Sequence, residues 1–265
     1  MSLVHSSFYR FTPVVDPAAL ADWLREAAAG LGGVVIVAGE GLSAAVAGPA
    51  ETLARFEAAL QRQPGFAGLH VKRNACERPP FSRLKVSVKR EIVAFGVPGV
   101  SGRDATDTHV SPQRWRELLA DPGTVVLDNR NSFEFRLGRF RGAVDPGVAH
   151  FRDFPAYVEA HREEWQGRTV AMYCTGGIRC EKTAAWMQAQ GITVAQLDGG
   201  ILNYLEAFPE DGARDWQGEC YVFDKRIAID AAGRETGTRA EAVFTDPADA
   251  WRLARARRLD PAAEE

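Results

Sequence analysis

Residues 169–190 read TVAMYCTGGIRCEKTAAWMQAQ, which predicts a strand, a short glycine-containing loop and a helix in direct succession. The apolar run 169–173 has the length and composition of a buried strand in a parallel sheet. Residues 181–190 have helix-forming composition, and Gly191 provides a C-cap. The loop therefore lies between the carboxyl end of a strand and the N-terminus of a helix, where open α/β sheets bind their ligands.

The loop itself begins with Cys174 and predicts an anion-binding pocket built around a sulfur nucleophile. Backbone N–H groups and the positive end of the following helix stabilise a thiolate, a persulfide or a bound anion. Four residues separate Cys174 from Arg179, one fewer than in cysteine phosphatases, and this shorter loop suits a terminal sulfur better than a phosphate. The alternative is a buried, inert thiol at a strand end, the commonest fate of a lone cysteine. The loop residues after the cysteine are Thr175, Gly176, Gly177, Ile178 and Arg179.

The composition is that of a soluble globular protein, with 265 residues of which 46% are apolar and 25% charged. The N-terminus has no basic segment followed by an apolar stretch, and no run approaches the roughly 20 apolar residues that cross a bilayer. We therefore expect a cytoplasmic protein without a membrane partner. The four cysteines form no C-x-x-C pair, so we expect reduced thiols rather than a disulfide framework or a metal cage.

Seven basic residues occur between positions 72 and 90, against the single acid Glu77. This cluster predicts a local positive face of the kind that follows a phosphate backbone. Charge alone equally favours a solvated strand and loop. The candidate RNA-binding residues are Lys72, Arg73, Arg78, Arg83, Lys85, Lys89 and Arg90.

The first ninety residues predict the order β-α-β-β-α-β, which is the ferredoxin-like α+β arrangement. The expected elements are an extended segment 8–15, a helix 17–31, strands 34–38 and 42–47, a helix 50–63 and a strand 69–73. This fold occurs in enzymes and in RNA-binding proteins alike, so it does not decide the function.

The second half alternates helices and strands, which predicts an α/β domain with a parallel sheet covered by helices on both faces. The expected elements are helices 112–120, 154–165 and 181–190 and strands 124–128, 169–173 and 193–197. We expect a ferredoxin-like domain over residues 1–92, a linker over 93–110, the α/β domain over 111–212 and a C-terminal extension over 213–265.

Three separated segments of the second half resemble the rhodanese family: VVLDNRNSFEFRLGRFRGAVDP (125–146), YCTGGIRCEK (173–182) and LDGGILNY (197–204). The resemblance implies that Cys174 corresponds to the persulfide-carrying cysteine and that the backbone of residues 175–179 cradles its outer sulfur. It also implies structural roles for Asp128 and Arg130, with Glu134 bracing the same region.

A narrower resemblance comes from the ferredoxin-like half together with HVSPQRW (109–115), FRDFP (151–155) and GECYVFDKR (218–226), in that order. The chain is similar over about residues 8–229 to the bacterial rhodanese-related tRNA uridine hydroxylase family. This resemblance implies oxygen-dependent formation of 5-hydroxyuridine at the wobble position, a tRNA partner, no DNA partner, and phosphate contact by the basic cluster. Longer family members carry cysteine pairs in a C-terminal extension, whereas no cysteine follows Cys220 here. The oligomeric state stays open.

The oxygen chemistry has no evident metal or organic cofactor in the sequence. We find neither a grouping of two histidines and a carboxylate nor a dinucleotide fingerprint, and molecular oxygen is the co-substrate that the resemblance implies. Our hypothesis is that Cys174 adds to C6 of the uracil ring and so activates C5. Cys180 is a candidate for resolving an oxidised Cys174, and its alternative is a packed residue of the first helical turn.

Two other functions remain open. A rhodanese-type sulfurtransferase would carry a persulfide on Cys174 to tRNA or to a protein acceptor, and the six-residue loop 174–179 supports it. A non-catalytic RNA-binding module is the other alternative, although degenerate rhodanese domains usually lack the loop cysteine that this chain retains.

Overall fold

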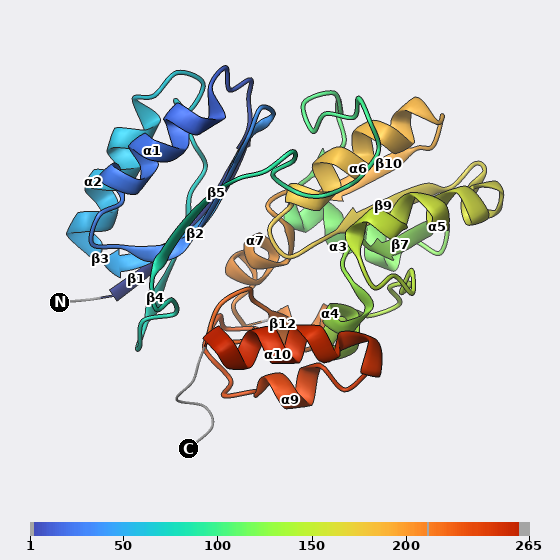
Figure 1. Cartoon of the computed structure of the whole chain (residues 1–265). Coiled ribbons are helices and arrows are strands. Elements are labelled where there is room, and N and C mark those ends of the chain that lie inside the picture. The colour runs from blue at the N-terminus through green and yellow to red at the C-terminus, as the bar shows by residue number, and fades with distance from the viewer. Residues whose placement is uncertain (1–2, 211, 260–265) are drawn as a thin grey trace. The chain divides into compact units, whose positions relative to one another are not determined.

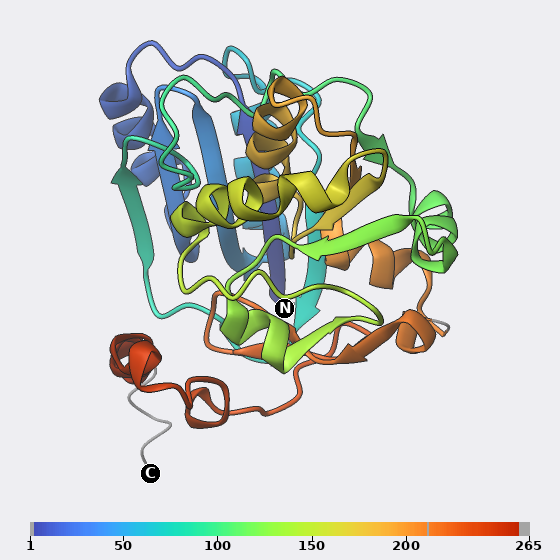
Figure 2. The ribbon, with the colours of Figure 1, turned by 90° about the vertical axis from the view of Figure 1, so that its right-hand side faces the viewer.

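The computed structural model describes residues 3–210 and 212–259, and its backbone divides into two compact units (Figures 1 and 2). Of the described residues, 3–94 together with 258 and 259 form one unit, and those from 95 to 257 form the other. Each unit has its own hydrophobic core, and each is described by itself below. No helix in the described ranges is long and apolar enough to cross a membrane.

The first unit is a five-stranded sheet in the order β4-β1-β3-β2-β5 with two helices. Its elements are β1 (Leu3–Phe11), α1 (Pro17–Ala27), β2 (Gly32–Ala38), β3 (Gly41–Pro49), α2 (Ala50–Gln61), β4 (Lys72–Cys76) and β5 (Leu84–Val88). The first four strands pair antiparallel, and β5 adds parallel to β2. The order and the antiparallel pairing confirm the ferredoxin-like prediction.

Helices α1 and α2 cover the same face of this sheet (Figure 1). Helix α1 begins where the sequence predicts, because Asp16 accepts hydrogen bonds from the N–H groups of Ala18 and Ala19 and Pro17 follows it. Under the helices, Val35, Val37 and other apolar side chains of the sheet are fully buried. This burial supplies the main stabilisation of the unit.

The strands of the first unit differ from the predicted ones at β1 and at both sheet edges, β4 and β5. Strand β1 covers residues 3–11 rather than 8–15, and β4 covers 72–76 rather than 69–73. The sequence predicts a strand from Leu69 because this residue is apolar. In the structure Leu69 is buried in the hydrophobic core but precedes β4. Strand β5 was not predicted at all, since its apolar residues alternate with Lys85 and Ser87 inside the basic cluster.

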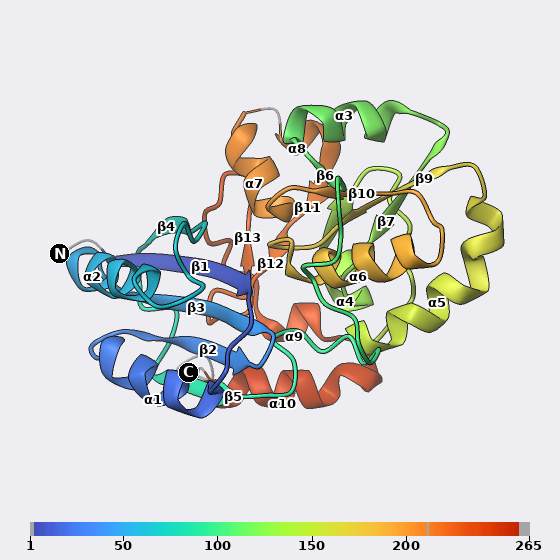
Figure 3. The same cartoon turned by 90° about the horizontal axis from the view of Figure 1, so that it is seen from above.

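The second unit contains a parallel sheet in the order β6-β10-β9-β7, with helices on both faces (Figure 3). Its strands are β6 (His109–Val110), β7 (Thr124–Asp128), β9 (Thr169–Tyr173) and β10 (Val194–Leu197). Helices α3 (Pro112–Ala120) and α7 (Gly200–Ala207) lie on one side, and α5 (Phe154–His161) and α6 (Ile178–Ala189) lie on the other. The predicted α/β architecture is confirmed. Helix α5 ends earlier than predicted, because residues 162–165 continue as a tighter 3₁₀ turn.

An aromatic cluster around Phe140 fixes the carboxyl end of β9. Phe140 lies in β8 (Gly138–Phe140), and its ring is 4.8 Å from that of Tyr173, 4.8 Å from Tyr204 and 5.2 Å from Trp216. Rings at such edge-to-face spacings pack favourably. Because Tyr173 ends β9, this cluster holds the backbone that leads into Cys174.

Residues 213–257 belong to this same unit. Strand β11 (Trp216–Gly218) pairs antiparallel with β8, and a hairpin of β12 (Cys220–Tyr221) and β13 (Ala228–Ile229) follows. Two further helices are α9 (Ala240–Val243) and α10 (Ala250–Leu259). The Tyr221 ring meets Phe133 of α4 (Ser132–Leu137) edge-on at 4.9 Å. Residues 213–257 are therefore a structural part of the second unit.

Candidate active site

Cys174 directly follows β9 at the carboxyl end of the parallel sheet, and its side chain is fully buried. Helix α6 begins at Ile178, three residues before the predicted start at Glu181. Gly177 makes the early start possible, because it occupies the N-cap with a φ of 101°. Arg179 and Cys180 consequently lie in the first helical turn rather than in the loop.

Backbone N–H groups of the loop converge on the sulfur of Cys174. The N–H of Gly177 donates to Cys174 Sγ over 3.1 Å, and the N–H groups of Arg179 and Cys180 also donate to it. These donors belong to the positive end of the α6 dipole. The loop is thus built to hold a negative sulfur.

The electrostatics of the site favour a thiolate at Cys174. Burial alone would raise the pKa of this thiol, but a hydrogen bond from Cys180, the charge of Arg179 and the backbone donors outweigh burial and lower the pKa well below its ordinary value. For Cys180, burial and the neighbouring thiolate raise the pKa well above its ordinary value. Cys180 therefore stays protonated and acts as a hydrogen-bond donor to Cys174.

Asn129 holds Cys180 in place from the loop that follows β7. Its side-chain Nδ2 donates to Thr183 Oγ1 over 2.7 Å and lies 3.8 Å from Cys180 Sγ. The N–H of Asn129 also bonds to the carbonyl of Tyr173 over 2.8 Å, which ties the loop after β7 to the end of β9. The position of the second thiol is set by the fold.

Arg179 braces the loop through a buried ion pair with Glu134. The guanidinium donates to both carboxylate oxygens, over 2.7 Å and 2.8 Å, and the two side chains are 8% and 0% exposed. Burial alone would raise the pKa of Glu134, but the charge of Arg179 and its hydrogen bonds lower it. Because both of its donor arms face Glu134, Arg179 stabilises the loop through this pair and acts on Cys174 by its charge.

Asp128 and Arg130 form a second buried ion pair, with both side chains fully enclosed. Arg130 donates to Asp128 over 2.6 Å and 2.8 Å and to the carbonyl of Gly138 over 2.6 Å. Asp128 ends β7 and is aligned with Tyr173 of β9. This pair joins the ends of β7, β8 and β9 beneath the loop.

Gly200 is a residue of the site that sequence reasoning did not single out. The first N–H groups of α7 donate to the loop, from Ile201 to the carbonyl of Cys174 over 3.0 Å and from Leu202 to that of Thr175 over 3.1 Å. Gly200 has a φ of 67°, and a Cβ there would lie 2.3 Å from the carbonyl oxygen of Cys174. The signal was the paired glycines in the segment LDGG after a predicted strand.

The basic cluster of residues 72–90 is spread over two strands and the segments beside them, and its contact with RNA stays a prediction. It is divided between β4 and β5, which are the opposite edges of the sheet in the first unit. Arg73 forms an ion pair with Glu57 of α2 on the helix-covered face. Lys72 is aligned with Ser7 and Lys85 with Val34, and both lie on the face away from the helices. Arg78, Arg83, Lys89 and Arg90 are exposed on the segments beside these strands.

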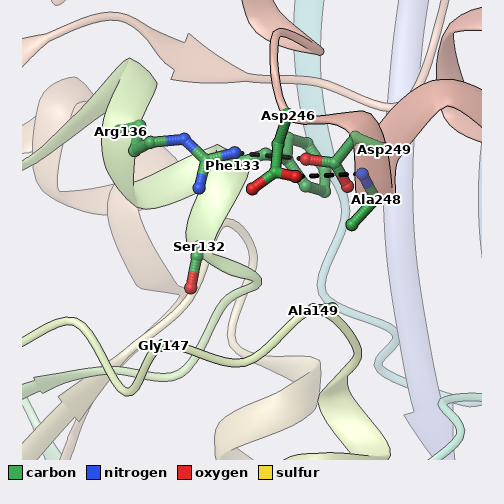
Figure 4. A pocket seen from close by; sticks show the side chains of 8 residues that line it. All are labelled: Ser132, Phe133, Arg136, Gly147, Ala149, Asp246, Ala248 and Asp249. Atoms are coloured by element: carbon green, nitrogen blue, oxygen red, sulfur yellow. Dashed lines mark hydrogen bonds and ion pairs between the residues drawn. The ribbon is translucent and has the colours of Figure 1, made fainter.

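A cavity of about 210 Å³ lies between α4 and the segment before α10, away from Cys174 (Figure 4). Arg136 donates to Asp249 across it over 3.1 Å, and Asp246 accepts the N–H of Ala248 over 2.9 Å. The bond between Arg136 and Asp249 attaches the C-terminal segment to the helix that carries Glu134. Within residues 3–210 and 212–259, no three His, Cys, Asp or Glu side chains gather in an arrangement that could hold a metal ion.

Comparison with known proteins identifies both units. Residues 3–92 match the UPF0176 acylphosphatase like domain, and residues 111–207 match the rhodanese-like domain. A tRNA uridine(34) hydroxylase of Synechococcus elongatus is 49% identical over 87% of this chain and 86% of its own length. The chain belongs to the tRNA uridine(34) hydroxylase family. The enzyme of this name from Legionella pneumophila is 40% identical over 86% of this chain and 91% of its own length. Membership in this enzyme family confirms the resemblance inferred from the motifs.

The first prediction concerns the charge of Cys174. The difference in absorbance at 240 nm between the protein and its Cys174→Ser variant should show a thiolate that titrates well below the usual thiol pKa of about 8.5. In guanidinium the same difference should titrate near that usual value. A depressed pKa in the folded state stabilises the fold above the unfolded pKa, so the stability difference between the two proteins should shrink as the pH falls through the folded pKa.

Two further variants separate the causes of this shift. Cys180→Ala should raise the pKa of Cys174, because the thiol donor is removed. Cys220→Ser should leave it unchanged, since burial raises the pKa of Cys220 to about 12 and this thiol stays neutral. A folded protein in which Cys174 titrates at or above the usual value would contradict the thiolate assignment.

The second prediction concerns Gly200. Gly200→Ala should lower the free energy of unfolding by clearly more than the 1–2 kcal/mol that a left-handed backbone costs a residue with a Cβ, because the new Cβ also collides with a backbone carbonyl. Gly191→Ala is the matched control, since Gly191 has a φ of 78° and open space around it. Denaturant unfolding measures the free energy of unfolding of both variants, and equal losses would contradict the close approach of Gly200 to the carbonyl of Cys174.

Proposed function

We propose that this protein hydroxylates uridine 34 of tRNA to 5-hydroxyuridine, with Cys174 as the reactive group and molecular oxygen as co-substrate. The observation that carries the proposal is the buried sulfur of Cys174, held as an anion by the loop N–H groups and by Cys180. The family membership supplies the reaction, because the relatives are named for hydroxylation of this uridine.

The chemistry follows from the nucleophilicity of a thiolate. The sulfur adds to C6 of the uracil ring, and the electron pair released from the C5–C6 double bond makes C5 nucleophilic. C5 then takes one atom of molecular oxygen. The other oxygen atom leaves as water, with two electrons and two protons from a donor. Loss of the C5 proton and cleavage of the carbon–sulfur bond restore the ring and the thiolate.

The first unit is the proposed contact for the tRNA backbone. Lysines 72 and 85 lie near opposite edges of the same sheet face, and Lys89 follows β5. Lysine ammonium groups bind phosphates without reading the base sequence, so they would position the tRNA rather than select it. Arg73 is left out of this set because Glu57 engages it. A cytoplasmic location, where tRNA is found and thiols stay reduced, fits this proposal.

A sulfurtransferase is the second candidate, and one contact favours it. The N–H of Gly177 that points at Cys174 Sγ belongs to a group of donors that would equally hold the outer sulfur of a persulfide. This function would move sulfane sulfur to tRNA or to a protein acceptor. The two candidates differ in the nucleoside that the tRNA acquires.

The third prediction distinguishes them. Mass spectrometry of tRNA nucleosides from a strain that lacks this gene should show loss of 5-hydroxyuridine and its derivatives and retention of thiolated bases. Incubation of unmodified tRNA with the protein, a reductant and ¹⁸O₂ should place one heavy oxygen in each 5-hydroxyuridine. Loss of a thiolated base with intact 5-hydroxyuridine would establish the sulfurtransferase instead, and 5-hydroxyuridine without the heavy oxygen would exclude molecular oxygen as the source.

A further inference from the structure

Phe223 is an exposed aromatic side chain beside the loop of Cys174. Its side chain is 59% exposed, and its ring centre is 5.9 Å from the guanidinium carbon of Arg179. Arg179 in turn is close enough to Cys174 for its charge to lower the pKa of the thiol. The ring therefore lies beside Arg179, a residue of the active-site loop region, and is accessible to a ligand from solvent.

The turn that carries Phe223 is held rigidly between β12 and β13. Arg226 donates to both carboxylate oxygens of Asp224, over 2.9 Å and 2.6 Å, and this pair is buried. The N–H of Val222 bonds to the carbonyl of Ile227 over 2.9 Å. Ile227 has a φ of 63°, a costly conformation for a β-branched residue. The fold thus maintains a strained turn that presents the ring outward.

The orientation of the ring is also fixed from behind. Tyr221 meets Phe223 edge-on, with ring centres 4.9 Å apart and planes at 89°. Tyr221 itself packs edge-on against Phe133, which precedes the loop-bracing Glu134 in α4. The ring of Phe223 is therefore placed by the same helix that supports the loop.

We propose that Phe223 is the platform on which the uracil base stacks when it is presented to Cys174. This inference rests on the proposed function. Proteins that act on bases of single-stranded RNA loops hold the unstacked base against an aromatic side chain. A phenyl ring offers a flat apolar face to the pyrimidine, and the neighbouring Arg179 adds positive charge at the same place. Phe223 would position the base, whereas Cys174 would react with it.

The test is a binding comparison between two forms of an anticodon stem-loop, one with uridine at position 34 and one with an abasic site there. Stacking of one base on an aromatic ring contributes about 1–3 kcal/mol, so Phe223→Ala should weaken binding of the uridine form by about 5- to 150-fold. The abasic form should bind to the variant as it binds to the wild-type protein. Phe223→Trp should retain the preference for the uridine form.

Trp251→Ala is the matched control, because Trp251 is an exposed aromatic residue of α10, 47% exposed, that stacks on Arg252 rather than Arg179. The Trp251→Ala substitution should leave the affinities for the uridine and abasic stem-loops unchanged. The inference would be overturned if Phe223→Ala weakened binding of the two stem-loops equally or weakened binding of neither. It would also be overturned if the wild-type protein bound the two stem-loops with equal affinity. A wild-type protein that prefers the uridine form but makes no 5-hydroxyuridine would contradict the proposed function and leave the stacking platform supported.

Discussion

A negative charge on a fully buried sulfur is the constraint on which the rest of the second unit depends. Removing a thiolate from water is costly unless donors and positive charge replace the lost hydration. The N–H groups at the start of α6, the proton of Cys180 and the charge of Arg179 replace it here. Each of these groups requires a particular backbone: a left-handed glycine at 177, a helix that starts at Ile178, and a strand that ends at Tyr173.

The bracing of that site extends outward through a series of buried contacts. Arg179 is fixed by Glu134, and Glu134 belongs to α4, which the C-terminal segment covers. Arg136 of the same helix pairs with Asp249. The segment after residue 212 therefore supports the loop indirectly, and through the turn at Phe223 it also lies beside Arg179.

Local patterns in the sequence predicted most of the architecture, because apolar runs, N-caps and glycines act on neighbouring residues. The ends of β7 and β9 were predicted to the residue, and the strand-loop-helix around Cys174 was recognised. Groups that meet only in three dimensions were harder to predict. Glu134, the partner of Arg179, is 45 residues away in the sequence. The close approach of Gly200 to the Cys174 loop depends on the pairing of β10 with β9. The division of the basic cluster depends on which strands form the edges of the sheet. A resemblance gave Glu134 a bracing role, but only the structure shows which group it holds.

The central claim is that hydroxylation proceeds through the sulfur of Cys174. The most direct measurement is the rate at which purified Cys174→Ser converts uridine 34 of unmodified tRNA to 5-hydroxyuridine in the presence of oxygen. Exchange of sulfur for oxygen preserves shape and removes the thiolate, so the rate should fall by about 100-fold or more, while Cys220→Ser should retain the wild-type rate. A Cys174→Ser protein that forms 5-hydroxyuridine at the wild-type rate would contradict the account.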